Sequence, residues 1–170
     1  MLEIVVGDIL KSKVDVIVFS AHPSLLAGSG VSGVIHRAAG PELEKAAKIL
    51  GPLRPGEAVI TPAFNLPAKY IIHTVCPRYI YGTSEDESLL AMAYRSALSL
   101  KIKAPDAFSI AFVSLGTGVY RWPLEIAARI AVTELCKSEF KSTMMCVENE
   151  ESRREYQESF DALSDFRAQC

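Results

Sequence analysis

Two glycine-rich stretches have the residue types and spacing to bind a phosphate group. The first runs Gly28-Ser29-Gly30-Val31-Ser32-Gly33, and the second runs Ser114-Leu115-Gly116-Thr117-Gly118-Val119-Tyr120. Glycines let a backbone approach a ligand closely, and free N–H groups before a helix bind anions. Neither stretch contains a lysine, so backbone dipoles would have to hold the phosphate. The GK[ST] ending of a P-loop is missing, which argues against nucleoside-triphosphate hydrolysis.

Each stretch alone could be a turn that only reverses the chain. The first also matches the GxGxxG pattern of dinucleotide-binding proteins, but that pattern normally follows its strand at once. Residues 20–27 intervene here, and the second stretch has no place in that scheme. A nicotinamide-dependent oxidoreductase is therefore the less favoured interpretation, and a two-loop phosphate site is the favoured one.

The surrounding sequence alternates short apolar runs with helical patterns, which predicts an α/β fold with a mixed, mostly parallel sheet. Each glycine stretch then connects the carboxyl end of a buried strand to a helix, where ligands collect in such folds. The predicted strands are Leu2–Val6, Val14–Phe19, Ala58–Thr61, Tyr70–Val75, Phe108–Val113 and Thr143–Val147. The predicted helices are Val31–Ala39, Pro41–Leu50, Glu85–Ile102, Pro123–Cys136 and Glu150–Leu163.

Size and composition predict one globular domain over residues 1–170, with 49% hydrophobic and 22% charged residues. A net charge of -2 argues against duplex nucleic acid as a partner. The four cysteines form no CxxC pair, so we expect reduced thiols and neither a metal site nor a cofactor. No signal sequence and no apolar run of membrane-spanning length is found, so we expect a cytoplasmic protein.

Taken together, these segments resemble the macrodomain family of ADP-ribose-binding modules over most of residues 4–135. The resemblance implies a three-layer α/β/α sandwich that binds ADP-ribose or a mono-ADP-ribosylated protein. The segments that carry it are Gly7–Ile9, Val14–Val18, the first glycine stretch with Gly33–Gly40, Gly56–Thr61, Tyr70–Val75 and the second glycine stretch.

The resemblance also implies roles for single residues. Asp8 would accept a hydrogen bond from the adenine amino group, and the backbone N–H of Ile9 would face the base. A helix N-cap is the alternative role for Asp8. The first stretch would hold the phosphate next to the distal ribose, and the second would close over the pyrophosphate, with Tyr120 or Val119 covering the ribose. The ADP-ribose-binding residues predicted in this way are Asp8, Ile9, Ala21, His22, Gly28, Ser29, Gly30, Val31, Ser32, Ser114, Leu115, Gly116, Thr117, Gly118, Val119 and Tyr120.

The sequence departs from the family at the positions used for hydrolysis. Family members that cleave ADP-ribose esters carry Asn-Ala-Ala-Asn where this chain has Phe19-Ser20-Ala21-His22, and an Asp where it has Ser32. A family aromatic that stacks on adenine corresponds to Glu148. Binding needs only the phosphate loops, whereas hydrolysis needs an activated water. We therefore predict binding. Hydrolysis of O-acetyl-ADP-ribose or of ADP-ribosylated acidic side chains is the alternative, with His22 as candidate catalytic base.

Three further residues are expected to be structural. His36 and His73 fall inside a predicted helix and a predicted strand, which favours satisfied interior histidines over ligand contacts. Trp122 precedes Pro123 and is expected to pack rather than to stack on a ligand.

Overall fold

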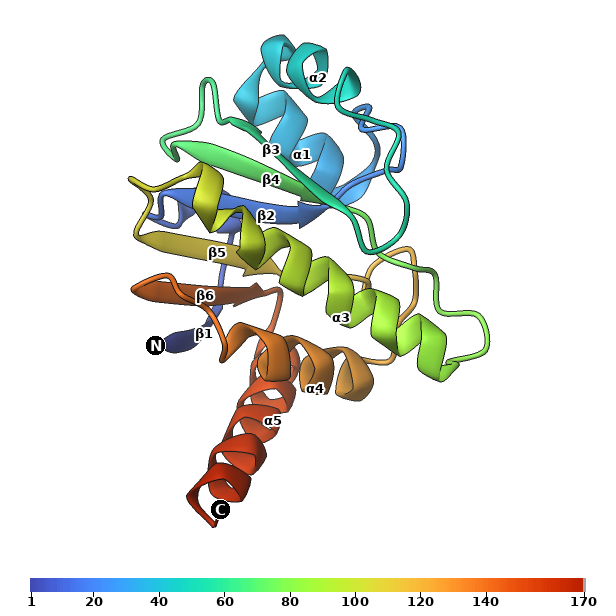
Figure 1. The fold of residues 1–170 in the computed structure, drawn as a ribbon, viewed down its shortest axis with the longest axis vertical. Helices are drawn as coiled ribbons and strands as arrows, with labels where there is room; N and C mark the ends of the chain where they lie inside the picture. The colour runs from blue at the N-terminus through green and yellow to red at the C-terminus, as the bar shows by residue number, and fades with distance from the viewer. Residues whose placement is uncertain (170) are drawn as a thin grey trace.

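The computed structural model describes residues 1–169, which form a six-stranded sheet with helices on both faces (Figure 1). The strand order is β1-β6-β5-β2-β4-β3, and every neighbouring pair is parallel except β3 with β4. The strands are β1 (Leu2–Val6), β2 (Val16–Ser20), β3 (Ala58–Pro62), β4 (Tyr70–Thr74), β5 (Ser109–Val113) and β6 (Ser142–Val147). The predicted α/β class with a mixed, mostly parallel sheet is confirmed.

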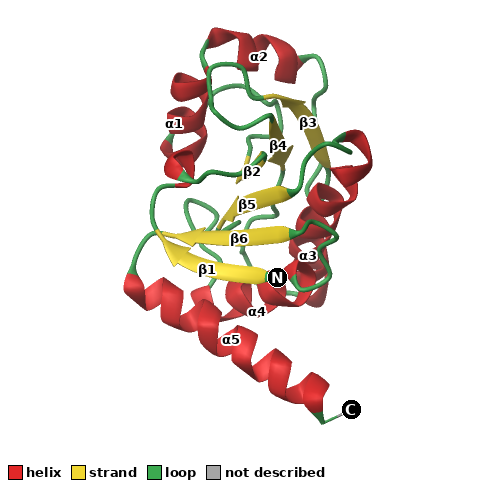
Figure 2. Cartoon of the chain, turned by 90° about the vertical axis from the view of Figure 1, so that its left-hand side faces the viewer, coloured by secondary structure: helices red, strands yellow, loops and turns green. Residues whose placement is uncertain are grey.

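The helices make the outer layers, and α1 and α3 lie on opposite sides of the sheet (Figure 2). No helix among residues 1–169 is long and apolar enough to cross a membrane. The α-helices are α1 (Gly30–Ala39), α2 (Pro41–Lys48), α3 (Ser84–Ser99), α4 (Leu124–Leu135) and α5 (Glu150–Ala168), and two 3-10 turns are η1 (Ile9–Lys11) and η2 (Leu100–Lys103).

The strand β2 explains why both faces of the sheet are covered. Its first four residues are all buried, and successive side chains of a strand point to opposite faces. Val16 and Val18 belong to the apolar cluster with α3, α4 and α5, whereas Ile17 and Phe19 belong to the cluster with α1 and α2. A continuous apolar run therefore specifies a central strand between two helical layers.

Local signals set most of the helix ends. Thr83 and Asp86 form a capping box at the start of α3, and Asn149 caps α5 through the backbone N–H of Ser152. Gly40, at φ +90°, separates α1 from α2, and Pro41 occupies the first turn of α2 as predicted. The glycine and the proline together explain why one helical pattern in the sequence becomes two helices.

The predicted element boundaries differ from the observed ones by a few residues. The second strand begins at Val16 and includes Ser20, because Asp15 turns its carboxylate back onto the start of β5. The long third helix ends at Ser99 and continues as the 3-10 turn η2. The last helix extends past Leu163 to Ala168, a polar stretch that runs away from the body of the molecule (Figures 1 and 2).

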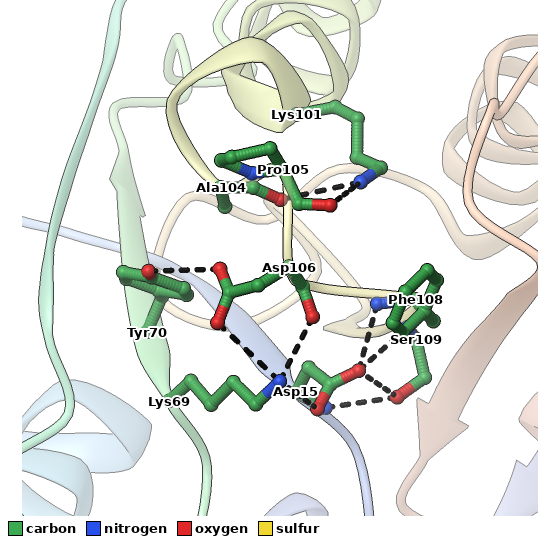
Figure 3. A network of polar contacts seen from close by, with 9 residues as sticks. All are labelled: Asp15, Lys69, Tyr70, Lys101, Ala104, Pro105, Asp106, Phe108 and Ser109. Carbon is green, nitrogen blue, oxygen red and sulfur yellow. Dashed lines mark hydrogen bonds and ion pairs between the residues drawn. The ribbon is translucent and has the colours of Figure 1, made fainter.

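A polar network ties together the amino ends of the central strands (Figure 3). The carboxylate of Asp15 accepts hydrogen bonds from the backbone N–H groups of Phe108 (2.7 Å) and Ser109 (3.1 Å). Lys69 Nζ lies 3.4 Å from a carboxylate oxygen of Asp15 and 3.4 Å from one of Asp106. Hydrogen bonds from Phe108 and Ser109 lower the pKa of Asp15. This network fixes β2, β4 and β5 at the edge opposite the two glycine loops.

Candidate functional site

The two glycine-rich stretches lie at one edge of the sheet. The first follows β2 and the second follows β5, and these strands are parallel neighbours, with Val18 paired to Phe112. Their carboxyl ends therefore point to the same edge (Figure 1). We call residues 20–33 loop 1 and residues 114–122 loop 2.

Loop 1 leads directly into the N-terminus of α1. The backbone N–H groups of Gly30, Val31 and Ser32 have no hydrogen-bond partner among residues 1–169, as expected for a first helical turn. Gly30 has φ +61°, a conformation that favours glycine. A Cβ on Gly33 would collide with the carbonyl oxygen of Gly28, so the loop lies tightly against the helix. The result is a fixed set of donors at the positive end of α1.

Loop 2 presents a second set of free donors. The N–H groups of Gly116, Thr117 and Gly118 have no partner within the described part of the chain. Gly116 has φ +85°, and a Cβ there would lie 2.6 Å from the Trp122 ring. Gly118 faces open space, with nothing within 4 Å of an added Cβ. Gly116 is therefore needed for the loop's shape, whereas Gly118 leaves room for a ligand.

Asp8 is an N-cap in this structure. Its Oδ1 accepts a hydrogen bond of 2.9 Å from the backbone N–H of Leu10, at the start of η1. The side chain of Ile9 is buried in the cluster with Phe19 and Ile35. Asp8 is exposed, so the capping role leaves its second carboxylate oxygen available. The contact of Asp8 with adenine stays a prediction.

His22 is exposed at the entrance of loop 1, and the geometry limits what its ring can do. The backbone N–H of Ser24 donates to His22 Nδ1 at 3.1 Å, and Ser24 Oγ lies 2.6 Å from the same nitrogen. In a neutral ring with Nδ1 as acceptor, the proton is on Nε2. His22 is then better suited to donate a hydrogen bond to a ribose hydroxyl than to act as a base.

The fold restricts what Ala21, Phe19 and Ser32 can contribute to a ligand site. The N–H of Ala21 donates to the carbonyl oxygen of Thr74 at 2.8 Å, so Ala21 can contact a ligand only through its methyl or carbonyl group. Phe19 is fully buried and cannot reach the site. Ser32 is 8% exposed, and its Oγ has no partner within residues 1–169.

Loop 2 lies against Arg78 and Tyr79, which the sequence did not identify as candidate site residues. The backbone N–H of Tyr79 donates to the carbonyl oxygen of Tyr120 at 3.0 Å, and Arg78 lies 5.6 Å from the centre of the Tyr120 ring. Val119 is 82% exposed at the tip of the loop. Tyr120 is thus held in place, whereas Val119 is free to cover a bound group.

Ser114, predicted to bind the ligand, uses its side chain inside the protein. Its Oγ lies 2.6 Å from the hydroxyl of Tyr156 and accepts a hydrogen bond from Thr117 Oγ1 at 2.9 Å. The backbone N–H of Leu115 donates to the hydroxyl of Tyr94 at 3.2 Å. Sequence reasoning missed Tyr94 and Tyr156, because only helical periodicity marks them as inward-facing.

The three residues expected to be structural are interior. His73 Nε2 lies 3.0 Å from Thr61 Oγ1, and burial lowers the pKa of His73 to about 3. Both histidines were expected to be satisfied, but Nδ1 of His36 and Nδ1 of His73 lack partners within residues 1–169. Both rings pack edge to face against Phe19, and His73 has in addition its contact with Thr61. Trp122 is buried and donates to the carbonyl oxygen of Pro77 at 2.8 Å, as expected for a packing residue.

Metal-ligating groups and the exposed Glu148 are two further possible parts of a site at this edge. No group of three or more metal-ligating side chains occurs among the described residues 1–169. Glu148 is exposed between β6 and α5. The candidate polar groups at this edge are backbone donors from the two loops, the carboxylate of Asp8 and the ring of His22.

Comparison with known proteins gives one consistent result. A family model described as Macro domain matches residues 18–131. A macro domain-containing protein of Lactiplantibacillus plantarum is 48% identical over 134 residues, which are 79% of this chain and 77% of that protein. An O-acetyl-ADP-ribose deacetylase of Cronobacter turicensis is 47% identical over 134 residues, covering 76% of each chain.

Solved structures agree with the family match. The Oceanobacillus iheyensis macrodomain with ADP has a TM-score of 0.89 and 41% identity, covering 96% of this chain and 92% of the other. The Trypanosoma brucei macrodomain in complex with ADP-ribose has a TM-score of 0.82 and 32% identity, covering 92% of this chain and 68% of the other.

Proposed function

The chain belongs to the macrodomain family, and we propose that it binds ADP-ribose, free or attached to a protein, between loop 1 and loop 2. One observation carries the proposal: two sets of unpartnered N–H groups, at Gly30–Ser32 and Gly116–Gly118, follow neighbouring parallel strands. A diphosphate presents anionic oxygens on two phosphorus centres, and each loop would serve one of them. Hydrogen bonds to charged groups contribute roughly 1.5–3 kcal/mol each.

The proposal places binding ahead of hydrolysis. Ser32 has no carboxylate to activate a water, and His22 engages its Nδ1 with Ser24. Neither change removes a backbone donor of loop 1 or loop 2. A preformed anion site binds ground-state ligand without a catalytic base, so loss of the base would leave affinity largely intact.

Titration calorimetry with ADP-ribose, AMP and NAD tests the proposal. We expect ADP-ribose to bind more tightly than AMP, because AMP lacks the second phosphate and the distal ribose. Absence of heat with ADP-ribose at micromolar to millimolar concentration would refute the function.

Gly118→Val sharpens this test. A Cβ added at Gly118 meets no heavy atom within 4 Å beyond its chain neighbours, so we expect the variant to fold like the wild type while filling the space proposed for the diphosphate. We expect an unchanged melting temperature and at least a ~10-fold loss of ADP-ribose affinity, about 1.4 kcal/mol. Ile102→Val, at an 85% exposed position before β5, is the matched control and should bind normally.

A second candidate function is cleavage of an ADP-ribose ester. It is favoured by relatives of 47% and 50% identity that are named O-acetyl-ADP-ribose deacetylase. Incubation with O-acetyl-ADP-ribose and with a protein mono-ADP-ribosylated on acidic side chains would reveal it as release of ADP-ribose. Activity that survives His22→Ala unchanged would exclude His22 as the base.

The cellular setting is part of the same proposal. Cys76 and Cys146 are buried free thiols, a pattern typical of proteins in a reducing compartment. We assign the binding activity to the cytoplasm, with a mono-ADP-ribosylated protein rather than duplex nucleic acid as partner.

A further inference from the structure

Loop 2 rests on two tyrosine hydroxyls that come from different helices. Tyr94 belongs to α3 and Tyr156 to α5, and both side chains are fully buried. Tyr156 is bonded to the side chain of Ser114, the first residue of the loop, and Tyr94 accepts from the backbone of Leu115, the second. Two successive residues of loop 2 are thus hydrogen-bonded to side chains of α3 and α5.

A third contact links this base to the part of the loop proposed to bind the ligand. Thr117 Oγ1 donates to Ser114 Oγ at 2.9 Å and lies 3.2 Å from the Ser114 carbonyl oxygen. Thr117 stands between Gly116 and Gly118, whose N–H groups are unpartnered within residues 1–169. The contacts therefore run without a gap from Tyr156 through Ser114 to Thr117, between the two glycines of the loop.

We propose that Tyr156, assisted by Tyr94, is a positioning residue that holds loop 2 in the shape needed to bind the diphosphate. This inference rests on the proposed function and names the residues that prepare one half of that site. The family model ends at residue 131, so Tyr156 lies outside the matched segment. The first turns of α5 thereby contribute to the proposed binding site, whereas its last turns extend away from the body of the molecule (Figure 2).

Both hydroxyls keep their protons near neutral pH, as such a role requires. Burial raises the pKa of Tyr156 to about 12 and raises the pKa of Tyr94 well above its ordinary value. Neutral hydroxyls bond to Ser114 and Leu115 without placing a negative charge beneath a phosphate-binding loop. A buried charge there would oppose anion binding.

Tyr156→Phe tests the proposal because it removes one oxygen and keeps the ring in the core. We expect the Kd for ADP-ribose to rise about 3- to 10-fold, the change that corresponds to one lost hydrogen bond. Amide hydrogen exchange at Gly116–Val119 should be faster than in the wild type.

Leu163→Ala is the matched control on the same helix. Leu163 packs against the same apolar cluster, and its hydrocarbon side chain cannot take part in the hydrogen bonds that hold loop 2. This variant should lower the melting temperature while leaving the ADP-ribose Kd and the exchange of Gly116–Val119 unchanged. All measurements are made well below the melting temperature of each variant, with folding checked by circular dichroism.

The outcomes separate the two proposals. If the wild type does not bind ADP-ribose, the proposed function fails, and the exchange of loop 2 still reports on Tyr156. If Tyr156→Phe leaves both exchange and affinity unchanged, or if Leu163→Ala changes them as much, Tyr156 does not position the loop. Faster exchange with an unchanged Kd likewise overturns the positioning role in binding.

Discussion

At the scale of single residues, the resemblance predicts that His22 and Ser32 stand where ester-cleaving macrodomains carry Asn and Asp. Ser32 is the third residue of α1, where a carboxylate is favoured by the helix dipole, and its Oγ has no partner within the described chain. His22 is exposed at the end of β2. We therefore expect both positions to accept the family's residues without a change of fold.

The double variant His22→Asn, Ser32→Asp is expected to gain ester hydrolysis. The introduced amide would orient the ribose and the introduced carboxylate a water, and such groups contribute roughly 10²- to 10⁴-fold to rates. We expect ADP-ribose release from a mono-ADP-ribosylated protein to increase about 10- to 100-fold over the wild type. Ser32→Ala is the control, since it adds no carboxylate, and it should bind ADP-ribose without hydrolysing the ester.

At the scale of elements, the Asp15 network and the proposed ligand-binding loops lie at opposite edges of the sheet. The Asp15 network joins β2, β4 and β5 at their amino ends, whereas the glycine loops follow the carboxyl ends of β2 and β5. Asp15→Ala leaves the N–H groups of Phe108 and Ser109 without their acceptor, which costs roughly 2–3 kcal/mol.

For Asp15→Ala, we expect urea unfolding to show this loss of stability. Calorimetry should give an ADP-ribose Kd within about 2-fold of wild type, a change in binding free energy below about 0.5 kcal/mol. Asp106→Ala provides the comparison: its carboxylate is 55% exposed, so a smaller loss is expected. A large drop in affinity for Asp15→Ala would mean that the two edges are coupled.

The sequence was sufficient to predict elements and loops because their signals are local. The apolar run of β2, the Gly40-Pro41 break and the glycines of loop 2 each act within a few residues. Boundaries were less well predicted where a distant partner decides them, as Asp15 shows by reaching residues 108 and 109.

The hydrogen bonds that support the candidate site could not be predicted either, because they join residues far apart in the sequence. Ser114 and Tyr156 are 42 positions apart, and no local pattern connects them. The N–H of Ala21 is not available to a ligand because it donates a hydrogen bond to Thr74, and this hydrogen bond follows from the register of β2 and β4. The candidate ligand groups were thus predictable from residue type and resemblance, whereas the contacts that hold them were not.

At the scale of the whole molecule, the buried His73 and the partly buried Asp15 predict how stability depends on pH. The folded-state pKa of His73 is about 3, below the ordinary value of 6.5, so the unfolded chain binds a proton first. Stability is then fully present above pH 6.5 and falls as the pH decreases toward 3, by about 1.4 kcal/mol per pH unit for one group. The lowered pKa of Asp15 acts in the same direction, but only from its ordinary value of 3.8 downward.

Urea titrations between about pH 4 and pH 8 test this prediction. Wild type should lose stability from about pH 6.5 downward, whereas His73→Gln, which keeps a polar partner for Thr61, should show a flatter profile. Equal slopes in the two proteins would mean that His73 does not control acid stability.

The pairing of β1 with β6 has a consequence for how the protein is made. Leu2 pairs with Thr143 and Val6 with Val147, so β1 pairs with a strand that lies about 140 residues further along the chain. During translation the amino-terminal strand has no partner until residue 147 has left the ribosome, and contacts of such long separation form slowly. Asp8, which follows β1 directly, reaches its final position only then. The central strands β2 and β5, which carry both glycine loops, can therefore pair before β1 and Asp8 are in place.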